Sequence, residues 1–159
     1  MTLMLALVKA IVLVTVLVLA CIQIPLDLRQ KVLSRLATLV ATMLIAIAVC
    51  VSAVVGSETT QMLRGVGVTV LVTSSYALWH RASPDSLGLG DVLLVVPLTL
   101  AVAYATAEFV VWWQLSAAIA GSVHATWARV RLSRARIPFG PHLLLTASAI
   151  LTADFVFSL

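Results

Sequence analysis

Charged residues are scarce in this sequence. Asp, Glu, Lys and Arg together make up 10% of the 159 residues, whereas a soluble domain carries about a quarter. Hydrophobic residues make up 62% of the chain, and a soluble fold could not bury this much apolar surface. The scarcity of charge therefore excludes an ordinary soluble protein. It favours an integral membrane protein with one domain over residues 1–159.

Cysteine is also rare, since only Cys21 and Cys50 occur and both lie inside apolar runs. Their separation is not that of metal ligands, so we interpret both as small buried apolar residues. The three histidines, His80, His124 and His142, likewise show no mutual ligand spacing. No serine–histidine, phosphate-loop or CxxC pattern is present. We therefore expect no disulfide, no metal and no cofactor.

Long apolar runs dominate the remainder of the sequence. A membrane helix needs about 20 apolar residues, and six runs approach that length: 2–25, 36–55, 65–79, 92–107, 109–129 and 141–157. The first run exceeds the apolar core of a secretory signal, and no small-residue cleavage site follows it, so we expect a retained span. The predicted fold class is all-α, a polytopic membrane helix bundle with about six transmembrane helices.

The basic residues are divided unevenly between the two sides of this predicted bundle. Eight of the ten follow the first, third and fifth runs: Arg29, Lys31, Arg35, Arg81, Arg129, Arg131, Arg134 and Arg136. The connections on the other side hold only Arg64, with Glu58 and Glu108. The positive-inside rule then predicts that the odd-numbered connections are cytoplasmic and that both termini lie outside. The net charge of +4 thus marks cytoplasmic loops, and we expect no nucleic-acid partner.

Two aspartates fall at the predicted cytoplasmic boundary. Asp27 follows the first run and Asp91 precedes the fourth, and the two spans between them return the chain to the same face. Neighbouring carboxylates cannot both ionise easily, so they share one proton. The ionised group can activate water for attack on a peptide carbonyl. The protonated one polarises that carbonyl and later protonates the leaving amine, without a metal.

Structural roles would also explain both aspartates. Asp91 would serve as an anionic cap at a helix start, and Asp27 as a loop residue paired with Arg29 or Lys31. A small transporter or channel is a third class of function, which requires polar residues through the middle of the bilayer. The charges here crowd the boundaries instead. Asp154 is expected at the outer interface, where Lys9 would extend its long stem toward water.

Three segments resemble motifs of the type IV prepilin peptidase family, the aspartic peptidases of the GxGD class. Residues 27–35 (DLRQKVLSR) resemble the family's aspartate with its basic cluster. Residues 88–91 (GLGD) match GxGD, and residues 137–141 (IPFGP) are similar to the Pro-Phe-Gly-Pro segment before the last helix. Their order, spacing and cytoplasmic placement match the family, whose usual count is six spans. The resemblance covers essentially the whole chain.

The resemblance implies that Asp27 and Asp91 are catalytic. The chain would then cleave short basic leaders from prepilin-like, membrane-anchored precursors at the cytoplasmic face of a bacterial plasma (inner) membrane, with the precursor and the lipid bilayer as its partners. Residues that would bind substrate or shape loops are Arg29, Lys31, Gly88, Gly90, Pro138, Phe139 and Gly140. The two glycines of GxGD suit a site where backbone passes close to a substrate chain.

The sequence departs from the family pattern at two places. The family often has Lys two positions after the GxGD aspartate, where this chain has Leu93, and its Ile-Pro-Asn reads Val32-Leu33-Ser34 here. These departures motivate an alternative, a catalytically impaired member acting in pilus or secretion assembly. A separation of the two carboxylates well beyond about 8 Å would favour it. The cysteine-bearing insertion of bifunctional members is missing, so we expect no methyltransferase activity.

Overall fold

The computed structural model describes residues 3–30, 33–55, 59–83, 87–132 and 139–158. These residues form six helices: α1 (Leu3–Gln30), α2 (Arg35–Val55), α3 (Thr59–Ala82), α4 (Leu89–Ala105), α5 (Ala107–Leu132) and α6 (Gly140–Ser158). The all-α expectation is confirmed, and each predicted apolar run coincides with the greater part of one helix. Lys31 and Pro138, together with Glu58 and Asp85, lie outside the described residues.

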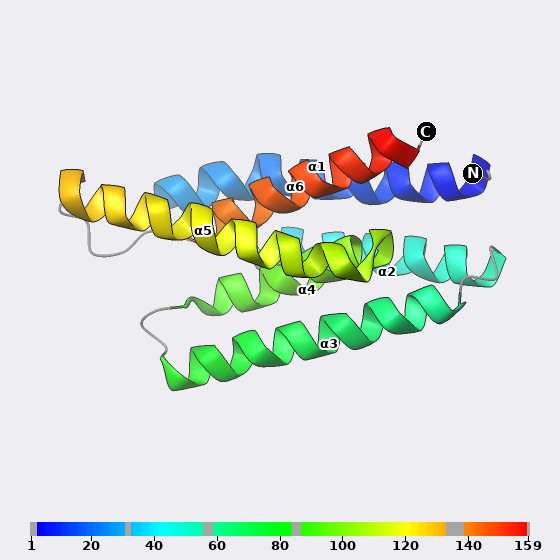
Figure 1. Ribbon diagram of the computed structural model, residues 1–159, viewed down its shortest axis with the longest axis horizontal. Helices are drawn as coiled ribbons and strands as arrows, with labels where there is room; N and C mark the ends of the chain where they lie inside the picture. The colour runs from blue at the N-terminus through cyan, green and yellow to red at the C-terminus, as the bar shows by residue number, and fades with distance from the viewer. Residues whose placement is uncertain (1–2, 31–32, 56–58, 84–86, 133–138, 159) are drawn as a thin grey trace.

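The helices run up and down and form one elongated bundle (Figure 1). Both termini lie at the same end of this bundle. At the opposite end α1 and α3 finish, and α4 and α6 begin. This topology brings the last turns of α1 to the end where the first turns of α4 and α6 lie. Arg29, Arg35 and Arg81 also belong to helix ends on that side.

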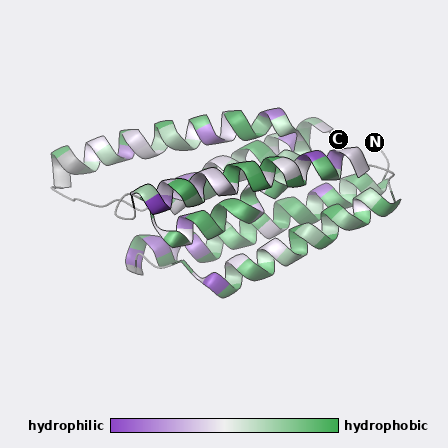
Figure 2. Cartoon of the chain, turned by 90° about the horizontal axis from the view of Figure 1, so that it is seen from below, coloured by the Kyte–Doolittle hydropathy of each residue, from purple (hydrophilic) through white to green (hydrophobic). Residues whose placement is uncertain are grey.

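Hydrophobic residues dominate the helices, and hydrophilic residues gather mainly toward helix ends (Figure 2). By length and composition, α1, α2 and α6 are suited to cross a membrane, whereas α4 is apolar but shorter. The helices α3 and α5 are more polar, because each carries charged, histidine and amide side chains. The structure is therefore compatible with a helical membrane bundle. Crossing by all six helices, and termini on the outer side, stay predictions.

Helix α4 is the most buried element of the bundle. It packs against α2, α3, α5 and α6, and also contacts α1. Its side chains Leu94, Val95, Leu98 and Val102 are fully buried. Because lipid is as apolar as these side chains, close packing between helices supplies much of the stabilisation in a membrane. A functional group at the start of α4 is therefore attached to the most constrained helix.

At the end of the bundle that holds the termini, Lys9 of α1 forms an ion pair with Asp154 of α6, with a distance of 2.9 Å from Nζ to Oδ2. Each side chain is only 14% exposed. The structure differs here from the expectation that Lys9 extends its stem toward water. Pairing replaces hydration because the two helices run side by side and hold the opposite charges together.

Candidate active site

Asp27 lies inside α1, which continues through Pro25 to Gln30. The expectation that Asp27 lies beyond the first helix is therefore wrong, because the helix extends past the apolar run that predicted its end. Gln23 and Asp27 are four residues apart and share one face of α1. That face is turned into the bundle, since the exposed fraction is 0% for Gln23 and 6% for Asp27. Arg29, two residues on, is exposed.

Gln23 fixes the connection from α1 to α2. Its Nε2 atom donates to the Ser34 carbonyl at 2.8 Å and to Thr38 Oγ1 at 3.0 Å, and its Oε1 atom accepts from the Ser34 backbone N–H at 2.8 Å. A buried amide with its partners in place ties the start of α2 to the penultimate turns of α1. Gln23 thereby holds the helix segment that carries Asp27. A single glutamine near the end of the first apolar run gave no signal of this role in the sequence.

Asp91 stands in the first turn of α4, three residues after the capping residue Gly88. Its carboxylate accepts hydrogen bonds from the backbone N–H groups of Gly88 and Gly140. The bond to Gly88 is the reciprocal contact of a capping box, so the interpretation of Asp91 as a cap is correct for α4. The second bond goes beyond capping, because it joins α4 to the first residue of α6.

The carboxylates of Asp27 and Asp91 converge on Gly140. A β-carbon placed on Gly140 would lie 2.8 Å from Asp27 Oδ2 and 3.3 Å from Asp91 Oδ1. Because both oxygens lie so near one position, they are at most about 6 Å apart. A side chain at residue 140 would enter the space between them. The glycine therefore keeps this space open, and residues from three helices form one acidic site.

The Asp27 carboxylate has no counter-ion among the described residues, and its Oδ2 atom is buried there without a hydrogen-bond partner. The described part of the chain therefore does not support the alternative in which Asp27 pairs with Arg29. A buried polar atom left unpartnered in a native fold requires an explanation, and catalytic sites are one recognised setting. Oδ2 remains available to bind water or a polar group of a ligand.

The two departures from the family pattern have different structural settings. Leu33 packs on the backbone of Gly90, since a β-carbon on Gly90 would lie 3.0 Å from Leu33 Cδ1 and 3.2 Å from Leu33 Cβ. The absence of a side chain at Gly90 thus allows α4 to approach Leu33 closely. Leu93 is 39% exposed and is two residues from Asp91, so it points away from the face that bears Asp91.

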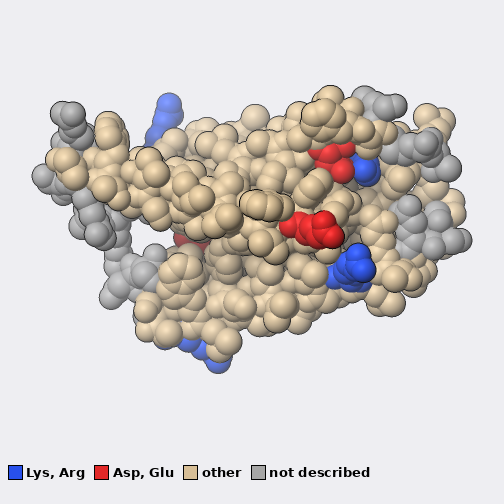
Figure 3. Space-filling model, in the orientation of Figure 1, with Lys and Arg blue, Asp and Glu red and all other residues tan. Residues whose placement is uncertain are grey.

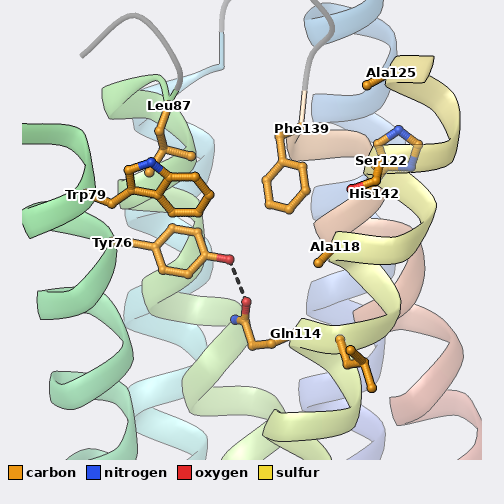
Figure 4. A pocket seen from close by; sticks show the side chains of 11 residues that line it. Tyr76, Trp79, Leu87, Gln114, Ala118, Ser122, Ala125, Phe139 and His142 are labelled. Atoms are coloured by element: carbon orange, nitrogen blue, oxygen red, sulfur yellow. Dashed lines mark hydrogen bonds between the residues drawn. The ribbon is translucent and has the colours of Figure 1, made fainter. Parts of the chain in front are cut away.

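A cavity of about 580 Å³ adjoins the aspartates between α3 and α5. Figure 3 shows acidic atoms at the inner end of the hollow between these helices. Leu87 precedes Gly88 along the chain, and Phe139 precedes Gly140, so the cavity and the acidic site share the same two backbone segments. The described residues that line the cavity are Tyr76, Trp79, Leu87, Gln114, Leu115, Ala118, Gly121, Ser122, Ala125, Phe139 and His142 (Figure 4).

Phe139 is placed on α5 by a glycine. A β-carbon on Gly121 would lie 2.8 Å from Phe139 Cε2 and 2.9 Å from Cδ2, so the aromatic ring lies directly against the bare backbone of α5. Phe139, predicted as a loop-shaping residue, thus forms part of the cavity wall. Gly88, Gly90 and Gly140 all lie at the aspartates, whereas Arg29 is exposed and Lys31 and Pro138 lie outside the described residues.

His124 and His142 form a hydrogen-bonded pair, with 2.9 Å between His124 Nδ1 and His142 Nε2. The absence of ligand spacing in the sequence concealed this pairing. A signal was available, because His124 lies near the end of one predicted span and His142 at the start of the next. Among the described residues, no group of three His, Cys, Asp or Glu side chains comes together in a way that could hold a metal ion.

Comparisons with known protein families, with curated proteins and with solved structures find no match. The resemblance to prepilin peptidases therefore rests on residues 27–35, 88–91 and 137–141. The described parts of these three segments meet at Asp27, Asp91 and Gly140.

Proposed function

We propose that this chain is a membrane-embedded aspartic endopeptidase that cleaves the leader peptide of type IV prepilin-like precursors. The observation that carries the proposal is the convergence of Asp27 and Asp91 on Gly140, with oxygens at most about 6 Å apart. Catalysis by a carboxylate pair needs both groups within reach of one water and one carbonyl. This separation is shorter than the distance of about 8 Å beyond which a non-catalytic role would be favoured.

In the proposed reaction, the two aspartates share one proton and bind a water molecule. The ionised carboxylate takes a proton from the water as its oxygen attacks the scissile carbonyl carbon. The protonated carboxyl polarises the carbonyl oxygen through a hydrogen bond. As the tetrahedral intermediate collapses and the C–N bond breaks, this carboxyl gives its proton to the leaving nitrogen, so the pair again holds one proton. The pair titrates as a unit, so neither residue is assigned a fixed role.

The fold supports this assignment by restricting the two carboxylates. Asp91 is held by two backbone N–H groups at the start of the most buried helix. Asp27 is held on a helix whose connection is fixed by Gln23. Groups positioned in advance lose less freedom when substrate binds, which lowers the barrier to reaction. Oδ2 of Asp27 is buried and has no hydrogen-bond partner among the described residues, so the proposal assigns the reacting water as its partner.

The proposal places the acidic site at the cytoplasmic face of a bacterial plasma membrane. It is supported by the basic residues Arg29, Arg35 and Arg81 at the same end of the bundle as the aspartates. Basic residues concentrate on the cytoplasmic side of membrane helices. A precursor anchored by its own apolar helix would then present its leader junction at the depth of Asp27 and Asp91.

A second candidate is a catalytically impaired member of the same fold that acts in pilus or secretion assembly. Leu93, which stands where the family often has Lys, favours it. The outward orientation of Leu93 and the short separation of the carboxylates favour the peptidase. The two candidates make opposite predictions about cleavage.

Co-expression with prepilin-like precursors tests the proposal. The wild type is expected to shorten a precursor by its leader, and Asp27→Ala and Asp91→Ala are expected to leave it uncut. Glu108→Gln, an exposed acidic position on α5, is the matched control and should cleave as the wild type does. Equal processing by the wild type and both alanine variants would refute the assignment.

A further inference from the structure

The cavity between α3 and α5 contains a buried donor that lacks a partner. Gln114 Oε1 accepts a hydrogen bond from the Tyr76 hydroxyl at 2.5 Å, which ties α5 to α3. The Nε2 atom of the same amide is buried and has no hydrogen-bond partner among the described residues. Figure 4 shows the Gln114 amide extending from α5 toward Tyr76 along the edge of the cavity. Buried amides are normally partnered, so this donor indicates a ligand with an acceptor oxygen.

The chemistry of the cavity wall defines the rest of that ligand. None of the described lining residues is an Asp, Glu, Lys or Arg. Trp79 and Leu87 stand on one side of the opening and Phe139 on the other (Figure 4). A wall without charge does not compensate the desolvation of a charged group, so the basic leader of a precursor does not belong here. Apolar side chains do, and a volume of about 580 Å³ is within the range that holds ligands of several such groups.

The cavity is also placed for a chain that reaches the aspartates. Leu87 and Phe139 are each one residue from a backbone N–H that bonds Asp91. Tyr76 and Gln114 line the same cavity as these two residues. A peptide with its scissile bond at Asp27 and Asp91 would therefore have its neighbouring residues beside Tyr76 and Gln114.

We propose that this cavity binds the apolar residues that adjoin the scissile bond of a peptide substrate, and that Gln114 Nε2 donates to a backbone carbonyl of that segment. Gln114 is then a substrate-positioning residue, oriented by Tyr76. An amide suits this role because a backbone carbonyl is the acceptor that every peptide carries. The inference rests on the proposed peptidase function, since it assigns a subsite to the same reaction.

Kinetic measurements on purified enzyme and a precursor test the role of Gln114. Gln114→Met removes the donor while keeping an unbranched side chain of similar length. It is expected to raise KM about tenfold with kcat little changed, because one buried hydrogen bond to the substrate is lost. Ser116→Ala is the matched control on α5, because the Ser116 hydroxyl bonds its own helix backbone at Trp113 and does not line the cavity. An unchanged KM for Gln114→Met would overturn the assignment of the donor.

A second variant fills the cavity without removing any hydrogen bond. Ala118 lines the cavity and is exposed, so Ala118→Phe can add its ring without displacing the core. This variant is expected to raise KM at least tenfold, and Ile119→Phe, on the adjacent outer position of α5, is expected to leave KM unchanged. Equal KM values for the two variants would overturn the assignment of the cavity.

Crosslinking separates failure of this inference from failure of the proposed function. A photoreactive phenylalanine in place of Trp79, which already presents an aromatic ring to the cavity, is expected to capture an added precursor in an Asp91→Asn background. The same group in place of Leu78, an exposed residue outside the cavity lining, is not. Cleavage by the wild type without capture at 79 would overturn the subsite and leave the peptidase intact. Capture at 79 without cleavage by the wild type would support the binding site and refute the peptidase.

Discussion

Asp27 and Gly140 lie 113 positions apart in the sequence, yet a β-carbon on Gly140 would lie 2.8 Å from Asp27 Oδ2. The same β-carbon would lie 3.3 Å from Asp91 Oδ1, and the Asp91 carboxylate also accepts the Gly140 backbone N–H. Gly140 is therefore the residue around which the acidic site is arranged. The absence of a side chain at this position, more than any charge, allows the two carboxylates to approach one another.

Gly140→Ala tests this arrangement. The added methyl group would displace the Asp27 carboxylate, and misplacement of a reacting group by about 1 Å can lower a rate about 100-fold. Alanine is the better helix former, so the thermal unfolding midpoint should change little. Cleavage rate and unfolding are measured on the same preparations.

Gly67→Ala is the control for Gly140→Ala, because a β-carbon on Gly67 would meet no atom within 4 Å. This substitution should leave both the cleavage rate and the unfolding midpoint near the wild-type values. A wild-type rate for Gly140→Ala would show that the site does not depend on the space at residue 140.

Gly90→Ala and Leu33→Ala are expected to compensate one another. A methyl group on Gly90 would crowd Leu33, with 3.0 Å to Cδ1, and such overpacking costs about 1–3 kcal/mol of unfolding free energy. Leu33→Ala leaves a space that this methyl group can enter. The double variant should therefore be more stable than the sum of the single changes by at least about 0.5 kcal/mol. Strict additivity in a double-mutant cycle would show that the contact is not formed.

Gln23→Leu should destabilise the fold through the connection from α1 to α2. It leaves the Ser34 N–H without its described partner, and a buried polar group so orphaned costs about 1–3 kcal/mol. The Ser34 carbonyl keeps its hydrogen bonds from the Thr38 N–H and hydroxyl. Thr15→Val is the control on the same helix, since the Thr15 hydroxyl bonds its own helix at Ile11. Equal unfolding midpoints for these two variants would show that Gln23 does not hold the helix segment that carries Asp27.

The ion pair between Lys9 and Asp154 predicts a non-additive effect on stability. Lys9→Met leaves a largely buried carboxylate without its partner, which costs about 3–5 kcal/mol. The double variant Lys9→Met with Asp154→Leu removes both charges and should recover most of that loss. Unfolding in detergent measures the stability of both variants. A double variant less stable than Lys9→Met would contradict the expectation that the unpaired carboxylate causes the loss.

Hydropathy and topology predict much of this fold and the location of the acidic pair. Six apolar runs coincide with six helices, and the even number of helices between Asp27 and Asp91 brings them to one end of the bundle. These properties depend on position along the long axis of the bundle, which sequence order encodes directly. The apolar run nevertheless predicts the end of α1 too early, because Leu26, Asp27 and Leu28 continue the helix beyond the uniformly apolar stretch.

Lateral neighbours are harder to predict than depth. The pairs His124–His142, Tyr76–Gln114 and Lys9–Asp154 each join different helices at a matching depth. Nothing in the separate runs specifies which helices pack together or which faces they present. The space at Gly140 is a further example. The sequence motif contains a glycine, but it does not show which side chains lie close to the position that a β-carbon would occupy.

The most direct test of the central claim is cleavage by purified enzyme reconstituted in lipid vesicles with a prepilin-like precursor. Asp27→Asn and Asp91→Asn keep the size and one acceptor oxygen of each side chain, so Asp91→Asn can keep one of the two backbone hydrogen bonds that hold Asp91. We predict that the wild type releases the leader and that both asparagine variants, folded as judged by their unfolding midpoints, release none. Leader release by either folded variant at the wild-type rate, or none by the wild type, would contradict a catalytic aspartate pair.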